Sequence, residues 1–143
     1  MFKRILVPVD LSDPDHFRDA LDTAANFSRQ FASKVRLVSV LPVLPSVVAD
    51  YVPLDTHNKM LDETSVKLNQ LASTLSLGEG SCEVSVREGS VYHEIIEEAE
   101  ACNADLIIMG SHRPAMATYL LGSNAARIVR HAPCSVMVLR GED

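Results

Sequence analysis

Residues suited to binding a small anion lie in two short segments of the second half of the chain. Gly110-Ser111-His112-Arg113 combines a glycine with hydroxyl, imidazole and guanidinium groups, and Gly122-Ser123-Asn124 adds a glycine and two polar side chains. Glycine lets the backbone approach a ligand closely or adopt positive φ. If Gly122 and Ser123 begin a helix, their unpaired N–H groups and the helix dipole favour an anion there. The alternative is that Gly122-Ser123 is only a helix cap and Gly110 only a turn.

The strands and helices around these segments must position them, and the hydrophobic pattern of the sequence predicts where those strands and helices lie. Short apolar runs of the kind found in covered strands occur at 5–9, 35–41, 105–109 and 135–139. Residues 82–87 alternate apolar and polar, the pattern of a strand with one solvated face. Apolar residues at helical spacing indicate helices at 14–31, 60–75, 91–102 and 122–131. Ala132 precedes Pro133, which disfavours helical backbone and ends the last helix.

Strand and helix alternate along the whole chain, which predicts an α/β fold with a mainly parallel sheet and helices on both faces, a three-layer arrangement. Ligands of such sheets bind beyond the carboxyl ends of the strands, near the point where the strand order reverses. The segments described above follow the fourth predicted strand, and Pro8-Val9-Asp10 ends the first. The sequence therefore predicts one ligand site at this edge of the sheet.

The composition limits the class of protein. The 143 residues are 47% hydrophobic, enough for one domain over residues 1–143, and the net charge of −6 argues against nucleic acid. No run reaches the ~18 apolar residues of a membrane span. The opening MFKRILVPVD has an Asp where a signal peptide would continue. We therefore expect a soluble cytoplasmic protein with no nucleic-acid or membrane partner.

The remaining polar residues indicate no metal site and no catalytic group. We expect buried free thiols at Cys82, Cys102 and Cys134, since their spacing contains no C-x-x-C. Surface positions are expected for His16, His57, His93 and His131. A solvated helix face is expected for Glu94, Glu97, Glu98 and Glu100. His112 has no neighbouring carboxylate in the sequence, so we interpret it as a hydrogen-bonding rather than a catalytic residue.

In this order and spacing, several motifs make the sequence resemble the universal stress protein family along essentially its whole length. They are ILVPVD-x-S, VREGSVYHEII, ADLIIMGSH and LLGSNAARIVRHAPCSVMVLR. The resemblance implies a five-stranded sheet in the order 3-2-1-4-5, a dimer and, in many members, a bound adenine nucleotide. We expect ATP or AMP, with Mg²⁺ as an accompanying ion.

Nucleotide-binding members carry G-x2-G-x9-G-[ST] after the fourth strand. Gly110 and Gly122-Ser123 match its ends, whereas Arg113 replaces the second glycine and eight residues separate it from Gly122. The sequence is similar to a subgroup with a shortened loop, GSHRP…YLLGSNA, in which Arg113 offers a bidentate phosphate donor.

The family's site carries over onto matching positions. The resemblance places Pro8, Val9 and Asp10 around the adenine and ribose, Val40 and Leu41 at the base edge, Met109 and Gly110 beneath the ribose and first phosphate, and Ser111, His112, Arg113, Gly122, Ser123 and Asn124 around the phosphates. The alternative for Asp10 is a residue that caps the next turn.

These observations lead to a hypothesis of a nucleotide-binding regulatory protein of the stress response without robust catalysis. One alternative is a nucleotide-free interaction module that acts through a regulatory protein partner. Another is a weak ATP hydrolase, although the sequence has neither G-x-x-x-x-G-K-[ST] nor a paired base and nucleophile.

The implied strand order makes the third and fifth strands the sheet edges. The third has a polar face with Glu83, Ser85 and Arg87, whereas the fifth, around Val136–Leu139, is apolar on both faces. A bare apolar edge invites pairing with another chain. We therefore expect a homodimer built on residues 135–140; the alternative is that a loop of the same chain covers this edge.

Overall fold

Five short strands form one sheet in the order β3-β2-β1-β4-β5. The computed structural model describes residues 2–43, 53–111 and 122–140. The strands are β1 (Arg4–Pro8), β2 (Lys34–Leu41), β3 (Cys82–Glu88), β4 (Leu106–Gly110) and β5 (Ser135–Leu139). All of these pairings are parallel, so the predicted α/β fold and strand order are confirmed.

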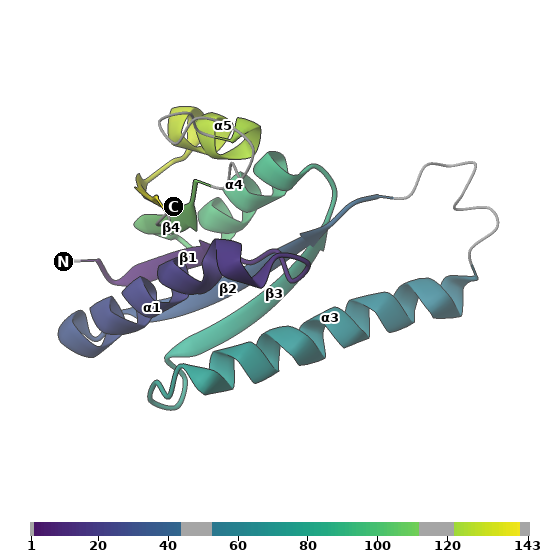
Figure 1. Cartoon of the computed structure of the whole chain (residues 1–143), viewed down its shortest axis with the longest axis horizontal. Coiled ribbons are helices and arrows are strands. Elements are labelled where there is room, and N and C mark those ends of the chain that lie inside the picture. Colours follow the sequence, from purple (N-terminus) through teal and green to yellow (C-terminus); the bar gives the residue numbers. More distant parts are fainter. Residues whose placement is uncertain (1, 44–52, 112–121, 141–143) are drawn as a thin grey trace.

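Within the described residues, four helices connect these strands and cover the sheet (Figure 1). They are α1 (Pro14–Phe31), α3 (Leu54–Thr74), α4 (Val91–Ala101) and α5 (Ser123–His131). Three begin and end within about two residues of the prediction, whereas α3 begins at Leu54 rather than at residue 60. Its first turns lack the apolar spacing on which the prediction relied, and Leu54 is 72% exposed.

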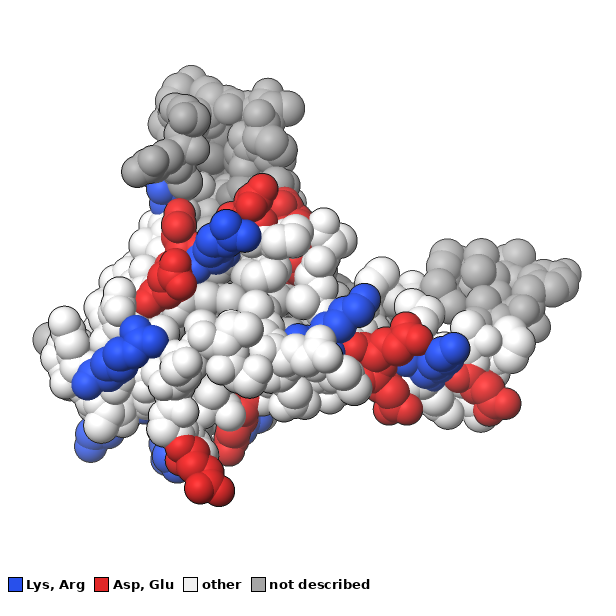
Figure 2. Space-filling model, turned by 60° about the horizontal axis from the view of Figure 1, so that its bottom comes forward, with Lys and Arg blue, Asp and Glu red and all other residues white. Residues whose placement is uncertain are grey.

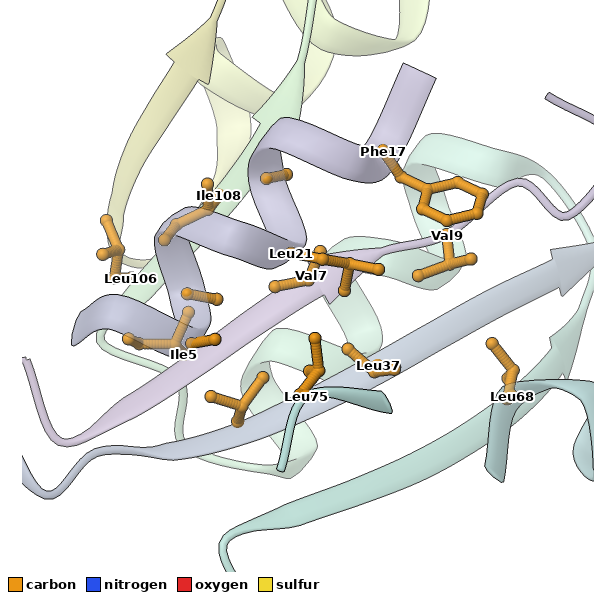
Figure 3. Packing of buried hydrophobic residues seen from close by; sticks show 14 residues of the cluster. Ile5, Val7, Val9, Phe17, Leu21, Leu37, Leu68, Leu75, Leu106 and Ile108 are labelled. Atoms are coloured by element: carbon orange, nitrogen blue, oxygen red, sulfur yellow. The ribbon is translucent and has the colours of Figure 1, made fainter. Parts of the chain in front are cut away.

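The two faces of the sheet bury two separate aliphatic clusters, because side chains alternate along each strand. On one face, Ile5, Val7 and Leu37 pack with residues of α1 and α3 such as Leu21 and Leu68 (Figure 3). On the other face, Leu6, Val38 and Ile107 pack with Ile95 of α4 and Ile128 of α5. The sheet is therefore covered on both faces, and each fully buried Leu or Ile contributes about 1.5–3 kcal/mol.

Local signals set the ends of α1 and α5. Asp13 is the N-cap residue of α1, and Pro14 lies in the first turn. Gly122 caps α5 with extended backbone, and Ala132 leaves the helical region with ψ 144° directly before Pro133. These two helices therefore begin at the carboxyl edge of the sheet.

The carboxylate of Asp105, directly before β4, joins the amino end of β4 to that of β1. Asp105 accepts hydrogen bonds from the backbone N–H groups of Lys3 and Arg4 at 2.8 and 3.1 Å. Its own N–H donates to the Arg4 carbonyl at 2.9 Å. The first residues of the chain are thereby fixed to a segment 102 residues later.

The prediction of a solvated acidic face on α4 is wrong for Glu98, whose side chain is only 3% exposed. It lies between Arg36 of β2 and Arg87 of β3, at 3.0 and 2.5 Å. Arg87 also pairs with Glu94 at 3.1 Å. The polar face of the edge strand β3 is therefore partly covered by α4 instead of facing water.

The three cysteines are free, as predicted, but half-buried rather than buried. Burial raises the pKa of the Cys82, Cys102 and Cys134 thiols. Elsewhere, basic and acidic side chains are interspersed over the face shown in Figure 2, which is the pattern of a solvated surface.

Candidate functional site

A pocket of about 530 Å³ lies at the carboxyl edge of the sheet, around β1, β2 and β4 and the first turns of α1, α4 and α5. This is within the usual range for small-molecule sites. It lies where the chain order reverses on either side of β1, as expected for an open parallel sheet. The described residues that line it are Pro8, Val9, Asp10, Ser12, His16, Val38, Val40, Pro42, Val91, Ile95, Met109, Gly110, Ser111, Gly122, Ser123, Asn124 and Ala125.

Most of the residues predicted for the site come together in this pocket. Those that line it are Pro8, Val9, Asp10, Val40, Met109, Gly110, Ser111, Gly122, Ser123 and Asn124. Leu41 is not part of the lining, and its carbonyl accepts a hydrogen bond from the N–H of Gly89 at 2.9 Å. His112 and Arg113 lie outside the described residues.

The polar end of the pocket is formed by the beginning of α5. Gly122 is the N-cap and Ser123 and Asn124 begin the helix, so their backbone N–H groups lie in the turn that has no intrahelical acceptor. The positive end of the helix dipole is at the same place. The basic residues Arg130 and His131 lie in the last turn instead. This end of the pocket is suited to an anionic group.

Asp10 holds the loop between β1 and α1. Its Oδ1 accepts hydrogen bonds from the Ser12 N–H at 3.0 Å and from the Ser12 hydroxyl at 2.5 Å. Its carbonyl accepts a hydrogen bond from the Asp13 N–H at 3.0 Å. Asp10 therefore does form the local turn that the alternative interpretation expected, and it also lines the pocket.

Gly110 is needed for packing at the pocket rather than for positive φ. A Cβ at this position would overlap the backbone carbonyl oxygen of His16 and would lie 3.1 Å from two atoms of its imidazole ring. The first turn of α1 therefore rests directly on the end of β4. The prediction that His16 is a surface residue is wrong, because it is half-buried and lines the pocket.

The pocket also has an apolar wall. Val38, Val40 and Pro42 contribute from β2 and the residues after it, and Val91 and Ile95 contribute from α4. The helical spacing of Val91 and Ile95 predicts a common face of a core helix, but not that its first turn borders a ligand site. No signal in the sequence distinguishes these two roles.

The described part of the chain has neither a metal cluster nor a membrane-spanning helix. Residues 2–43, 53–111 and 122–140 contain no group of three His, Cys, Asp or Glu side chains that could hold a metal ion. Over the same ranges, no helix combines the length and the apolar character needed to cross a membrane.

The parallel sheet and the pocket at its switch point define a doubly wound α/β protein. The chain belongs to the universal stress protein family, whose profile, described as "Universal stress protein family", matches residues 1–140. Universal stress protein G of Shigella flexneri is 33% identical over 145 residues, covering 98% of this chain and 100% of that protein. The family resemblance expected from the motifs is confirmed, and the chain is a stress-response protein.

Solved structures agree with this assignment. The chain is similar to the hypothetical protein MJ0577 with a TM-score of 0.80 and 26% identity, covering 100% of this chain and 99% of that one. A universal stress protein family protein from Arabidopsis thaliana, solved with AMP bound, has a TM-score of 0.65 and 16% identity over 98% and 92% of the two chains. At that identity the second comparison shows the fold alone.

Proposed function

We propose that this protein binds an adenine nucleotide, ATP or AMP, and acts as a cytoplasmic regulatory protein of the stress response without robust catalysis. The observation that carries the proposal is the mixed lining of the pocket of about 530 Å³. It combines apolar side chains of β2 and α4 with the start of α5, which matches a ligand that carries both a flat ring and phosphate. The AMP bound to the Arabidopsis relative supports the same assignment.

Different residues of the pocket lining would contact the base, the ribose and the phosphates. Val40, Val91 and Ile95 would contact the base, and Asp10 would lie beside the ribose. The N–H groups of Ser123 and Asn124 would donate to phosphate oxygens. His112 and Arg113, expected at the phosphates, remain part of the proposal.

An accompanying Mg²⁺ would be held mainly by the phosphates. Mg²⁺ commonly keeps several waters and takes only one or two carboxylates from the protein. Asp10 is the carboxylate of the described lining, and its Oδ1 is engaged by Ser12. The site therefore fits an ion that enters with the nucleotide, and the ion would neutralise phosphate charge.

We propose no catalytic residue. Hydrolysis needs a group positioned to take a proton from the attacking water, and Asp10 is tied to its own turn. ATP turnover should stay below about 1 s⁻¹, the lower end for ordinary enzymes. Sustained turnover above that rate which His112→Ala abolishes would instead support the weak ATP hydrolase.

Mass spectrometry of small molecules released from protein purified without added ligand tests the proposed function. The expected result is AMP, ADP or ATP in a stoichiometric amount, and calorimetry should then show rebinding to the stripped protein. If no nucleotide is released and none binds at millimolar concentration, the nucleotide-free module that acts through a regulatory protein partner becomes the better explanation.

We also propose a homodimer through residues 135–140. β5 pairs with β4 on one side only among the described strands, and Val136, Met137, Val138 and Leu139 are half-buried. A two-fold axis beside this edge would pair β5 with itself in an antiparallel manner and close the assembly.

A further inference from the structure

An ion cluster around the buried carboxylate of Glu98 lies next to the apolar wall of the pocket. We call Arg36, Arg87, Glu94 and Glu98 the α4 ion cluster. Glu98 pairs with Arg36 of β2 at 3.0 Å and with Arg87 of β3 at 2.5 Å, and Arg87 reaches Glu94 at 3.1 Å. Glu98 is 3% exposed, and a hydrogen bond from Ser85 adds a third donor to its carboxylate.

The cluster and the pocket share one face of the sheet. Along β2, Arg36, Val38 and Val40 point to the same side because side chains alternate. Arg36 binds Glu98, whereas Val38 and Val40 line the pocket. In the parallel register, Arg87 of β3 lies opposite Val40. The charged groups are therefore the immediate neighbours of the pocket wall.

On α4, too, the charged residues are neighbours of the residues that line the pocket. Glu94 and Glu98 lie on the helix beside Val91 and Ile95, the two residues that α4 contributes to the pocket. Residues three and four positions apart are neighbours on a helix surface. Glu94 also packs close to Gly89, where a Cβ would lie 3.0 Å from its side chain. The first turns of α4 are thereby held against the ends of β2 and β3.

A movement of α4 along or away from the sheet would separate Glu98 from its partners. A buried carboxylate without its partners is strongly unfavourable, so the cluster fixes the distance between α4 and β2. A second contact, Arg127 of α5 over the Tyr92 ring at 4.9 Å, joins α4 to the helix at the polar end.

We infer that the α4 ion cluster sets the width of the pocket between α4 and β2 and so determines its preference for a ligand with a flat ring. Glu98, Arg36 and Arg87 are positioning residues, since they act through Val38, Val40, Val91 and Ile95. The inference rests on the proposed nucleotide site. It predicts that loss of the cluster weakens binding of a ligand that carries a base much more than binding of phosphates alone.

The test compares ATP with inorganic triphosphate, which lacks a base, in calorimetry well below the unfolding temperature. Glu98→Gln removes the negative charge of the cluster. Arg87→Lys keeps the positive charge but removes the planar guanidinium group, whose separate N–H groups reach two carboxylates. Leu75→Ala, which truncates a core residue on the opposite face of the sheet, serves as the control for general destabilisation.

We expect both cluster variants to bind ATP at least fivefold more weakly and to bind triphosphate within twofold of the unmodified protein. Leu75→Ala should change neither affinity. An equal loss for the two ligands, or no loss for either, would overturn the inference. The Arg87 side chain is 24% exposed against 3% for Glu98, so Arg87→Lys remains informative if Glu98→Gln does not fold.

Amide hydrogen exchange gives a readout that needs no ligand. In Glu98→Gln and Arg87→Lys, amides of residues 91–99 should exchange at least tenfold faster than the same amides in Leu75→Ala. If the unmodified protein binds neither ligand, the proposed function fails and exchange alone decides the inference. Exchange of 91–99 equal to that in Leu75→Ala would contradict the positioning role.

Discussion

Gly122 combines two requirements at a single residue. It caps α5 with extended backbone and lines the polar end of the pocket. Gly122→Val would place a branched side chain in the path of a phosphate group, so we expect nucleotide affinity to fall at least tenfold, about 1.4 kcal/mol. Calorimetry measures the change. Arg130→Val, at the opposite end of the same helix, should bind as the unmodified protein does.

Gly110 is constrained by a neighbouring backbone. Gly110→Ala would force the first turn of α1 away from the end of β4, because the new Cβ would meet the His16 carbonyl oxygen. Overpacking of this kind costs about 1–3 kcal/mol, and denaturant unfolding should show it. Gly78→Ala is the matched control, since its Cβ would be 3.5 Å from Ser81 Oγ, an ordinary contact. Equal stability of the two variants would contradict the assigned role.

At the scale of the elements, the position of α4 depends on the ionisation of Glu98. Burial by itself raises the pKa of Glu98, but the hydrogen bonds from Arg87, Arg36 and Ser85 outweigh burial and hold it below its ordinary value. A carboxyl with a lowered pKa in the folded state stabilises the protein above its unfolded pKa, and this stabilisation is lost as pH falls through the folded value.

Glu98→Gln should therefore be less stable than the unmodified protein at neutral pH, by about 1–3 kcal/mol for the unpaired buried groups. The difference should shrink below the ordinary glutamate pKa of about 4.5. Urea unfolding at pH 7, 5, 4 and 3 measures it. A difference that stays constant over this range would show that the charge of Glu98 does not stabilise the fold.

The helices and strands were largely predictable from the sequence, because the signals that specify them lie within each segment. Apolar runs and helical spacing reflect periods of two and 3.6 residues, which need no knowledge of distant segments. The burial of Glu98 was not predictable, because its partners Arg36 and Arg87 lie on strands β2 and β3, apart from α4 in the sequence. The same reason explains His16, whose place at the pocket depends on how α1 packs against β4.

At the scale of the whole molecule, β5 provides a test of assembly. The Leu139 carbonyl accepts a hydrogen bond from Ser111 at 3.0 Å, so the backbone groups of Leu139 point toward β4. Alternation along the strand then points the N–H of Val138 outward. Val138→Pro removes that outward donor and should weaken the proposed dimer while the pairing of β4 with β5 remains.

Sedimentation at tens of micromolar measures this effect. The unmodified protein should be a dimer, and Val138→Pro should shift it toward monomer at the same concentration. Val43→Pro, after β2 and away from β5, should leave the dimer intact. A monomeric unmodified protein would count against this interface.

The bond network of Asp105 has a consequence for how the protein is made. Lys3 and Arg4 find this partner only after 102 and 101 more residues, respectively, have been synthesised. The pocket needs a still longer chain, because Pro8 and Asp10 meet Gly122 and Ser123 there. Nonlocal pairing of this kind forms late and slowly. A nascent chain that ends before α5 therefore has no complete pocket, and nucleotide can stabilise only a protein whose synthesis has reached that helix.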